Sequence, residues 1–125
     1  MEKINLILDC DPGHDDAIAI VLAASSPKIN LLGITIESGN QTLEKTGYNA
    51  LKIVEYLNLD VPVCLGSNAP IVKKAEICSV IHGETGLDGV DFPPVKKKFN
   101  ERNAVNFLIE TIKKTNNITV VTTGP

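Results

Sequence analysis

The 125-residue sequence lacks tryptophan and has few aromatic residues, which make up 4% of the chain. It also lacks a basic excess, because its formal net charge is −3. Binding of nucleic acid requires a concentrated basic surface, and the one basic run, residues 96–98, is interpreted as a solvated loop. We therefore expect an aliphatic core and no nucleic-acid partner.

Long apolar runs and paired cysteines are missing as well. No segment has the roughly 18 apolar residues of a membrane span, and the N-terminus has no signal-peptide pattern. The three cysteines, Cys10, Cys64 and Cys78, are odd in number and show no CxxC spacing, which disfavours a disulfide framework or a zinc site. We expect a cytoplasmic protein with reduced, mostly buried thiols and no membrane partner.

Apolar runs of strand length alternate with helical patterns along the chain. Strands are predicted at residues 4–8, 30–36, 61–65 and 118–122, helices at 15–24, 42–57 and 100–115, and an irregular stretch at 66–99. This order predicts an α/β fold with an open, mostly parallel, Rossmann-like sheet and flanking helices, truncated after about the fourth strand. Ligands bind beyond the carboxyl ends of parallel strands. We expect the site where the polar junctions 9–16, 37–40, 66–68 and 122–124 meet.

The first junction, DCDPGHDD at residues 9–16, has four carboxylates in eight positions and no Lys or Arg. A turn that caps a helix explains one or two of them. Like charges this close raise one another's pKa unless a cation lies among them. Clustered carboxylate oxygens suit Ca²⁺ or Mg²⁺, so the sequence favours a bound divalent cation.

Three families place acidic residues at the end of a first parallel strand. A phosphorylation receiver domain also needs an Asp after its third strand, where this chain reads CLGSN at residues 64–68. Dehalogenase-type phosphatases begin with D-x-D, as Asp9 to Asp11 does, but a following Pro-Gly and Asp-Asp are foreign to them. A phosphatase with Asp9 as nucleophile stays open as an alternative.

The third match extends over the whole chain. The segment DCDPGHDDAIAI at residues 9–20 resembles the N-terminal signature of the inosine-uridine-preferring nucleoside hydrolases. The resemblance continues through SGNQT at 38–42, HGETGLDG at 82–89 and TTGP at 122–125, in the family's order. Residues 1–125 are therefore expected to form the N-terminal portion of a single nucleoside hydrolase-type α/β domain, with the C-terminal half absent from this chain.

The resemblance implies hydrolysis of the N-glycosidic bond of ribonucleosides to ribose and free base, with bound Ca²⁺. By position, Asp11 matches the general base and a metal ligand, and Asp16 matches the main carboxylate ligand. Thr123 matches a threonine whose backbone carbonyl binds the metal. Asp15 matches the residue that bonds a ribose hydroxyl, and Asn40 matches one that orients water or ribose.

The resemblance also bears on the remaining polar residues and on the whole protein. His82 is expected to bind or assist the base, Asp9 to support the loop, and His14, at a variable position of the motif, to have no catalytic role. Relatives in the family act in nucleoside catabolism and salvage as dimers or tetramers, so a homo-oligomer is expected. We expect the isolated chain to be inactive, and a non-catalytic nucleoside-binding remnant remains a further alternative.

Overall fold

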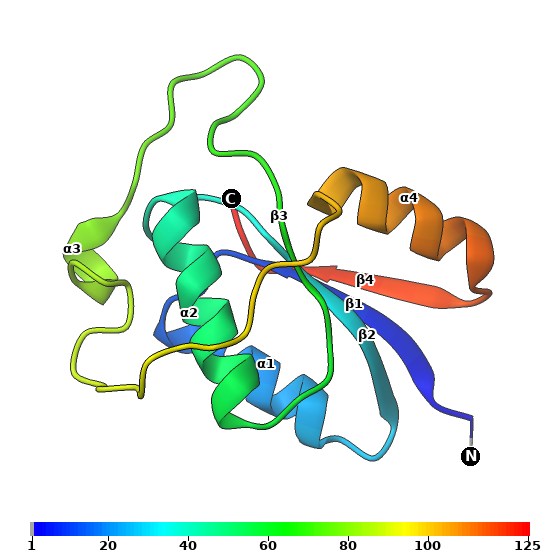
Figure 1. Ribbon diagram of the computed structural model, residues 1–125. Helices are drawn as coiled ribbons and strands as arrows, with labels where there is room; N and C mark the ends of the chain where they lie inside the picture. The colour runs from blue at the N-terminus through cyan, green and yellow to red at the C-terminus, as the bar shows by residue number, and fades with distance from the viewer. Residues whose placement is uncertain (1) are drawn as a thin grey trace.

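In the computed structural model, which describes residues 2–125, four parallel strands form one sheet with helices on both faces (Figure 1). The elements in chain order are β1 (Ile4–Cys10), α1 (His14–Ser25), β2 (Ile29–Ile36), α2 (Leu43–Tyr56), β3 (Val63–Leu65), α3 (Ser79–His82), α4 (Ala104–Lys114) and β4 (Ile118–Thr122). The strand order is β3-β2-β1-β4, and each neighbouring pair is parallel. The predicted open α/β sheet is confirmed.

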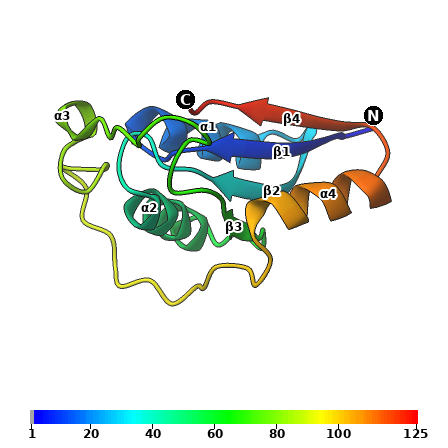
Figure 2. The same ribbon diagram turned by 90° about the horizontal axis from the view of Figure 1, so that it is seen from above.

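The two faces of the sheet are buried by different helices because side chains alternate along each strand. On β1, Leu6 and Leu8 belong to the larger apolar cluster, to which α1 and α2 contribute. Ile7 points to the other face and packs with Ala104 and Phe107 of α4. In Figure 2 the α1 helix passes behind the strands. The chain therefore buries apolar side chains on both faces, as expected for a parallel sheet.

The third strand begins later than predicted. Val61 and Pro62 lie outside β3, which starts at Val63. Proline has no N–H to donate to a ladder, although the carbonyl of Pro62 still accepts a hydrogen bond from the Ile34 N–H at 2.9 Å. Pro62 therefore still hydrogen-bonds to β2 through its carbonyl, although β3 itself begins only at Val63.

The long stretch between β3 and α4 contains one turn of helix, α3, that the sequence pattern does not predict. It also exposes Cys78, whereas Cys10 and Cys64 are buried and all three thiols are free. Burial raises the pKa of the Cys64 thiol to about 11, so this thiol stays protonated and packs as an apolar group. Among residues 2–125, every helix is too short or too polar to span a lipid bilayer.

The predicted helix at 100–115 begins at Ala104 because Asn103 caps it. The side chain of Asn103 accepts a hydrogen bond from the Asn106 N–H at 2.9 Å. This bond satisfies one of the free N–H groups of the first turn. Residues 100–102 consequently lie outside the helix and lead the chain onto the α4 face of the sheet.

We expect Asn103→Ala to lower the free energy of unfolding by about 1 kcal/mol, the usual cost of losing an N-cap. Asn106→Ala is the matched control, because Asn106 contributes only its backbone N–H to the cap. Urea denaturation of both variants measures the difference. Equal destabilisation by the two substitutions would show that the cap does not contribute.

Candidate active site

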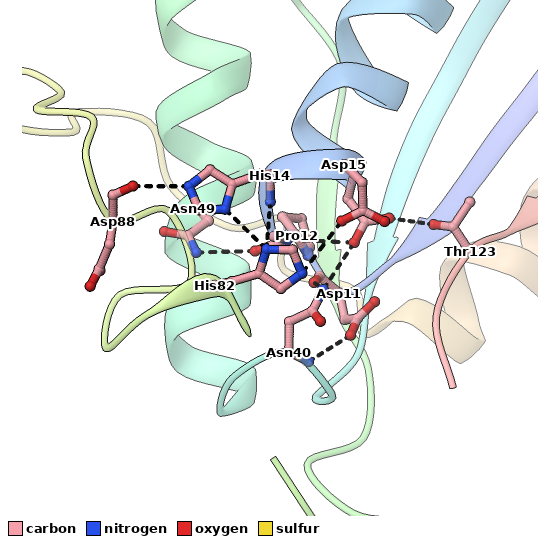
Figure 3. Close-up of polar contacts among 11 residues, drawn as sticks. Asp11, Pro12, His14, Asp15, Asn40, Asn49, His82, Asp88 and Thr123 are labelled. Carbon is pink, nitrogen blue, oxygen red and sulfur yellow. Dashed lines mark hydrogen bonds and ion pairs between the residues drawn. The ribbon is translucent and has the colours of Figure 1, made fainter. Parts of the chain in front are cut away.

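Asp11, the first residue after β1, is buried, with 4% of its surface exposed. Its carboxylate Oδ2 accepts a hydrogen bond from the Asn40 N–H at 2.6 Å, and the Asn40 side-chain amide donates to the Asp11 carbonyl at 2.9 Å (Figure 3). The turn after β1, with Asp11, meets the turn after β2, with Asn40, because β1 and β2 are adjacent parallel strands. Cys10 is paired to Ile36 at their carboxyl ends. Asn40 thus holds the backbone and the side chain of Asp11.

Asp16, in the first turn of α1, is also buried and receives contacts from its own turn and from two other segments of the carboxyl edge. Its Oδ2 lies 3.4 Å from the Gly13 N–H nitrogen, within the capping box of the helix, and 3.4 Å from Asn40 Nδ2. Its Oδ1 accepts a hydrogen bond from the Thr123 hydroxyl at 2.6 Å. Thr123 reaches this position because β4 pairs with β1. The two buried carboxylates are therefore fixed by residues from the ends of β2 and β4.

The carboxylates in this region destabilise one another's charged forms. Burial raises the pKa of Asp11 to about 6; the Asn40 N–H opposes this rise, and the charge of Asp16 adds to it. Burial likewise raises the pKa of Glu37 to about 7, with contributions from the charges of Asp9, Asp11 and Asp16. The site is thus an acidic pocket in which added positive charge would be stabilising.

No Lys or Arg neutralises this pocket within residues 2–125. The two ion pairs described there are His82 with Asp15, and Arg102 with Glu110 on α4. No three His, Cys, Asp or Glu side chains of these residues come together as a ready metal-binding group. The donors on offer are therefore two carboxylates and neutral oxygens, a set whose chemistry fits a hard cation such as Ca²⁺ or Mg²⁺.

Asp9 lies in β1 and accepts hydrogen bonds from the chain segments on both sides of this strand. Its carboxylate accepts a hydrogen bond from the Thr35 hydroxyl of β2. Its carbonyl accepts one from the Thr123 N–H at 2.9 Å. Asp9 consequently links three strands at the point where the site begins.

Asp15 and His82 form the outer side of the site. The Asp15 side chain is 75% exposed, and its Oδ1 lies 3.7 Å from His82 Nε2. His82 is largely covered, with 14% of its side chain exposed. The sequence places these residues 67 positions apart, and the structure brings them together near the buried Asp11 (Figure 3).

Asn49 lies at the candidate site and was not predicted from the sequence. It is buried on α2 and donates to the Pro12 carbonyl at 3.1 Å and to the Thr85 carbonyl at 2.7 Å. It thereby ties the aspartate turn to the loop that carries His82. An amide among the apolar positions of an amphipathic helix is the signal that could have identified it, because a buried amide requires partners.

An open parallel sheet with flanking helices defines an α/β protein, and the buried acidic pair lies beyond its strand ends, where proteins of this class bind their ligands. Comparison with known families is more specific. The family described as "Inosine-uridine preferring nucleoside hydrolase" matches residues 6–125, and the chain belongs to this family.

Individual relatives agree with this assignment. The pyrimidine-specific ribonucleoside hydrolase RihB of Escherichia coli O9:H4 (strain HS) is 50% identical over 126 residues, a match that covers 100% of this chain and 40% of that protein. The structure of a purine-preferring ribonucleoside hydrolase from Gardnerella vaginalis superimposes with a TM-score of 0.91 at 37% identity, covering 97% of this chain and 40% of the other. A plant nucleoside hydrolase superimposes with a TM-score of 0.89 at 31% identity, covering 98% and 40%.

The chain therefore spans about 40% of the length of the relatives that it matches. That residues 1–125 form the N-terminal portion of one domain stays a prediction.

Proposed function

We propose that the protein hydrolyses the N-glycosidic bond of ribonucleosides, releasing ribose and free base. The observation that carries the proposal is the convergence of Asp11, Asp16, Asn40 and Thr123 at one edge of the sheet, with contacts of 2.6 to 3.4 Å between them. Membership in the nucleoside hydrolase family supports it independently.

In this proposal Asp11 is the general base. Cleavage gives the ribose oxocarbenium character, and a water attacks the anomeric carbon. Asp11 accepts a proton from that water. In the metal-free chain burial raises the pKa of Asp11 to about 6, and a bound cation would lower it again. Asn40 holds the Asp11 carboxylate through its N–H and has its own amide near Asp16, so it can orient water or ribose.

We further propose that Asp11, Asp16 and the backbone carbonyl of Thr123 hold a Ca²⁺ ion. A bound cation supplies positive charge that favours ionisation of water and binding of ribose hydroxyls. The hydroxyl of Thr123 orients the Asp16 carboxylate for this purpose. Asp15 bonds a ribose hydroxyl, and His82, which lies beside it, contacts the base.

Uridine is the first substrate to assay, because relatives at 50% identity are named pyrimidine-specific, whereas the purine-preferring structure is 37% identical. Inosine is the second. We expect ribose release from one of them by a form of the protein as long as these relatives, and no useful turnover or strong Ca²⁺ binding by the 125-residue chain. Absence of ribose release from both nucleosides by the longer form would contradict the proposal.

The phosphatase alternative would use Asp9 as nucleophile. The Thr35 hydroxyl on its carboxylate and its place within β1 favour a supporting role instead. A phosphate-ester assay with Mg²⁺ separates the two activities. Cytoplasmic location and assembly into a dimer or tetramer stay predictions.

A further inference from the structure

Two histidines from distant motifs are in direct contact beside the proposed site. His14 is the first residue of α1, and His82 is the last residue of α3. Their Nδ1 atoms lie 3.0 Å apart, and their ring centroids are separated by 5.2 Å (Figure 3). The other ring nitrogen of His14, Nε2, lies 2.9 Å from the carbonyl oxygen of Asp88. His14 thus connects His82 at the end of α3 with Asp88 in the loop that follows α3.

The acceptor for His14 is held in place by its own loop. The Asp88 carboxylate accepts hydrogen bonds from the Thr85 N–H at 2.9 Å, the Thr85 hydroxyl at 2.5 Å and the Glu84 N–H at 3.1 Å. The Asp88 N–H donates to the His82 carbonyl at 3.3 Å. Since Asp88 closes the turn, its carbonyl gives the His14 ring a fixed partner.

The packing of the His82 ring on the aspartate turn is equally close. A Cβ atom added to Gly13 would lie 2.9 Å from two carbon atoms of the His82 ring, Cγ and Cδ2. Such a distance is too short for a real side chain at position 13, so the ring needs the glycine next to it. The His82 ring is consequently confined by Gly13 and by His14.

The contact with Asp88 determines which ring nitrogen of His14 carries a hydrogen. A carbonyl oxygen carries no hydrogen, so Nε2 of His14 must carry one. A neutral His14 then accepts at Nδ1, and His82 donates from its Nδ1. The His14 backbone N–H also lies 3.3 Å from His82 Nδ1, to which it can donate when that nitrogen carries no hydrogen. In both arrangements Nδ1 of His82 is occupied, and Nε2, facing Asp15, is the available nitrogen.

We propose that His14 is a positioning residue: it engages Nδ1 of His82 and so presents Nε2 toward Asp15 and the substrate. The assignment of His82 to the base rests on the proposed function, whereas the ring contact itself does not. Orienting one ring nitrogen through a bond to the other is a general way to fix the tautomer of a functional histidine.

Two substitutions test the contact in the 125-residue chain. The polar atoms of His14→Asn lie near the former Nδ1, so this variant can keep the bond to His82. His14→Gln reaches toward the former Nε2, so it can keep the Asp88 bond. It loses the side-chain bond to His82, which leaves only the backbone N–H of residue 14 near His82 Nδ1. Because His14 is exposed, both variants are expected to fold, as backbone amide spectra would confirm.

The readout is the ¹⁵N shifts of the His82 ring, recorded above the ordinary pKa of imidazole, about 6.5. We expect His14→Gln to move these shifts and His14→Asn to keep them near their wild-type positions. A change of tautomer moves ring nitrogen shifts far more than the loss of a neighbouring ring does. Unchanged shifts in His14→Gln, or an equal displacement in both variants, would overturn the proposal.

Kinetics on a form as long as the relatives give a second readout. We expect His14→Gln to lower kcat roughly 10-fold, which is less than the factor of about 10² to 10⁴ contributed by a general acid or base itself. KM should change less than about two-fold, and His14→Asn should restore most of kcat. Equal kcat in wild type and His14→Gln would overturn the positioning role. An inactive wild-type protein would instead contradict the proposed function, and the ring shifts would still decide the contact.

Discussion

In a form of the protein as long as its relatives, Asp11→Asn is expected to lower nucleoside hydrolysis by a factor of about 10² to 10⁴, the usual contribution of a general base. The amide is nearly the same size as the carboxylate, and its oxygen can still accept the Asn40 N–H. It cannot accept a proton from water, and it removes one of the two anionic donors proposed for Ca²⁺. Initial rates of ribose release from uridine and inosine measure the effect.

Stability distinguishes this loss of activity from a loss of fold. Burial raises the pKa of Asp11, which means that the folded protein already disfavours its charge. The metal-free Asp11→Asn variant should therefore unfold at the same temperature as the wild type or a higher one. Asp60→Asn, the same chemical change at an exposed residue before β3, is the control. Undiminished activity in Asp11→Asn would remove Asp11 as the base.

The convergence of the candidate site residues was predictable from the sequence because parallel strands end at a common edge. The polar junctions after the strands mark Asp11, Asn40 and Thr123 without knowledge of the strand order. The contact of Thr123 with Asp16 requires that order, since it depends on β4 lying next to β1. Apolar runs identify strands but do not specify their neighbours, so this contact could not be predicted from the pattern alone.

The outer side of the site was less predictable. The stretch between β3 and α4 has no periodic pattern, and its course follows from individual bonds such as Asn49 to the Thr85 carbonyl. The contact between His14 and His82 depends on that course, and the sequence, in which His14 occupies a variable position of the motif, gave no sign of it. Local turn chemistry inside HGETGLDG is visible in sequence, whereas the docking of that loop on α1 and α2 is a tertiary effect.

The acidic pocket should make the metal-free chain less stable as the pH rises. The pKa values of Asp11 and Glu37 are raised to about 6 and about 7, mainly by burial. Between their unfolded values near 4 and these values, the folded state binds more protons than the unfolded state. Their stabilising contribution is therefore complete below about pH 4 and is lost as the pH rises through 6 and 7.

We expect the free energy of unfolding in EDTA to fall by about 2 kcal/mol between pH 5 and pH 8, a value reduced for solvent screening of the partly exposed Glu37. Glu55 and Asp88, whose pKa values are lowered, act in the opposite direction, but only at pH values below this window. Urea denaturation at several pH values measures the slope. Glu37→Gln should reduce the slope of stability against pH, because the amide does not titrate. Glu101→Gln, an exposed control, should leave the slope unchanged. A stability that rises from pH 5 to pH 8 in EDTA would show that the carboxylates are already compensated within the chain, and the argument for a cation at this edge would lose its electrostatic basis.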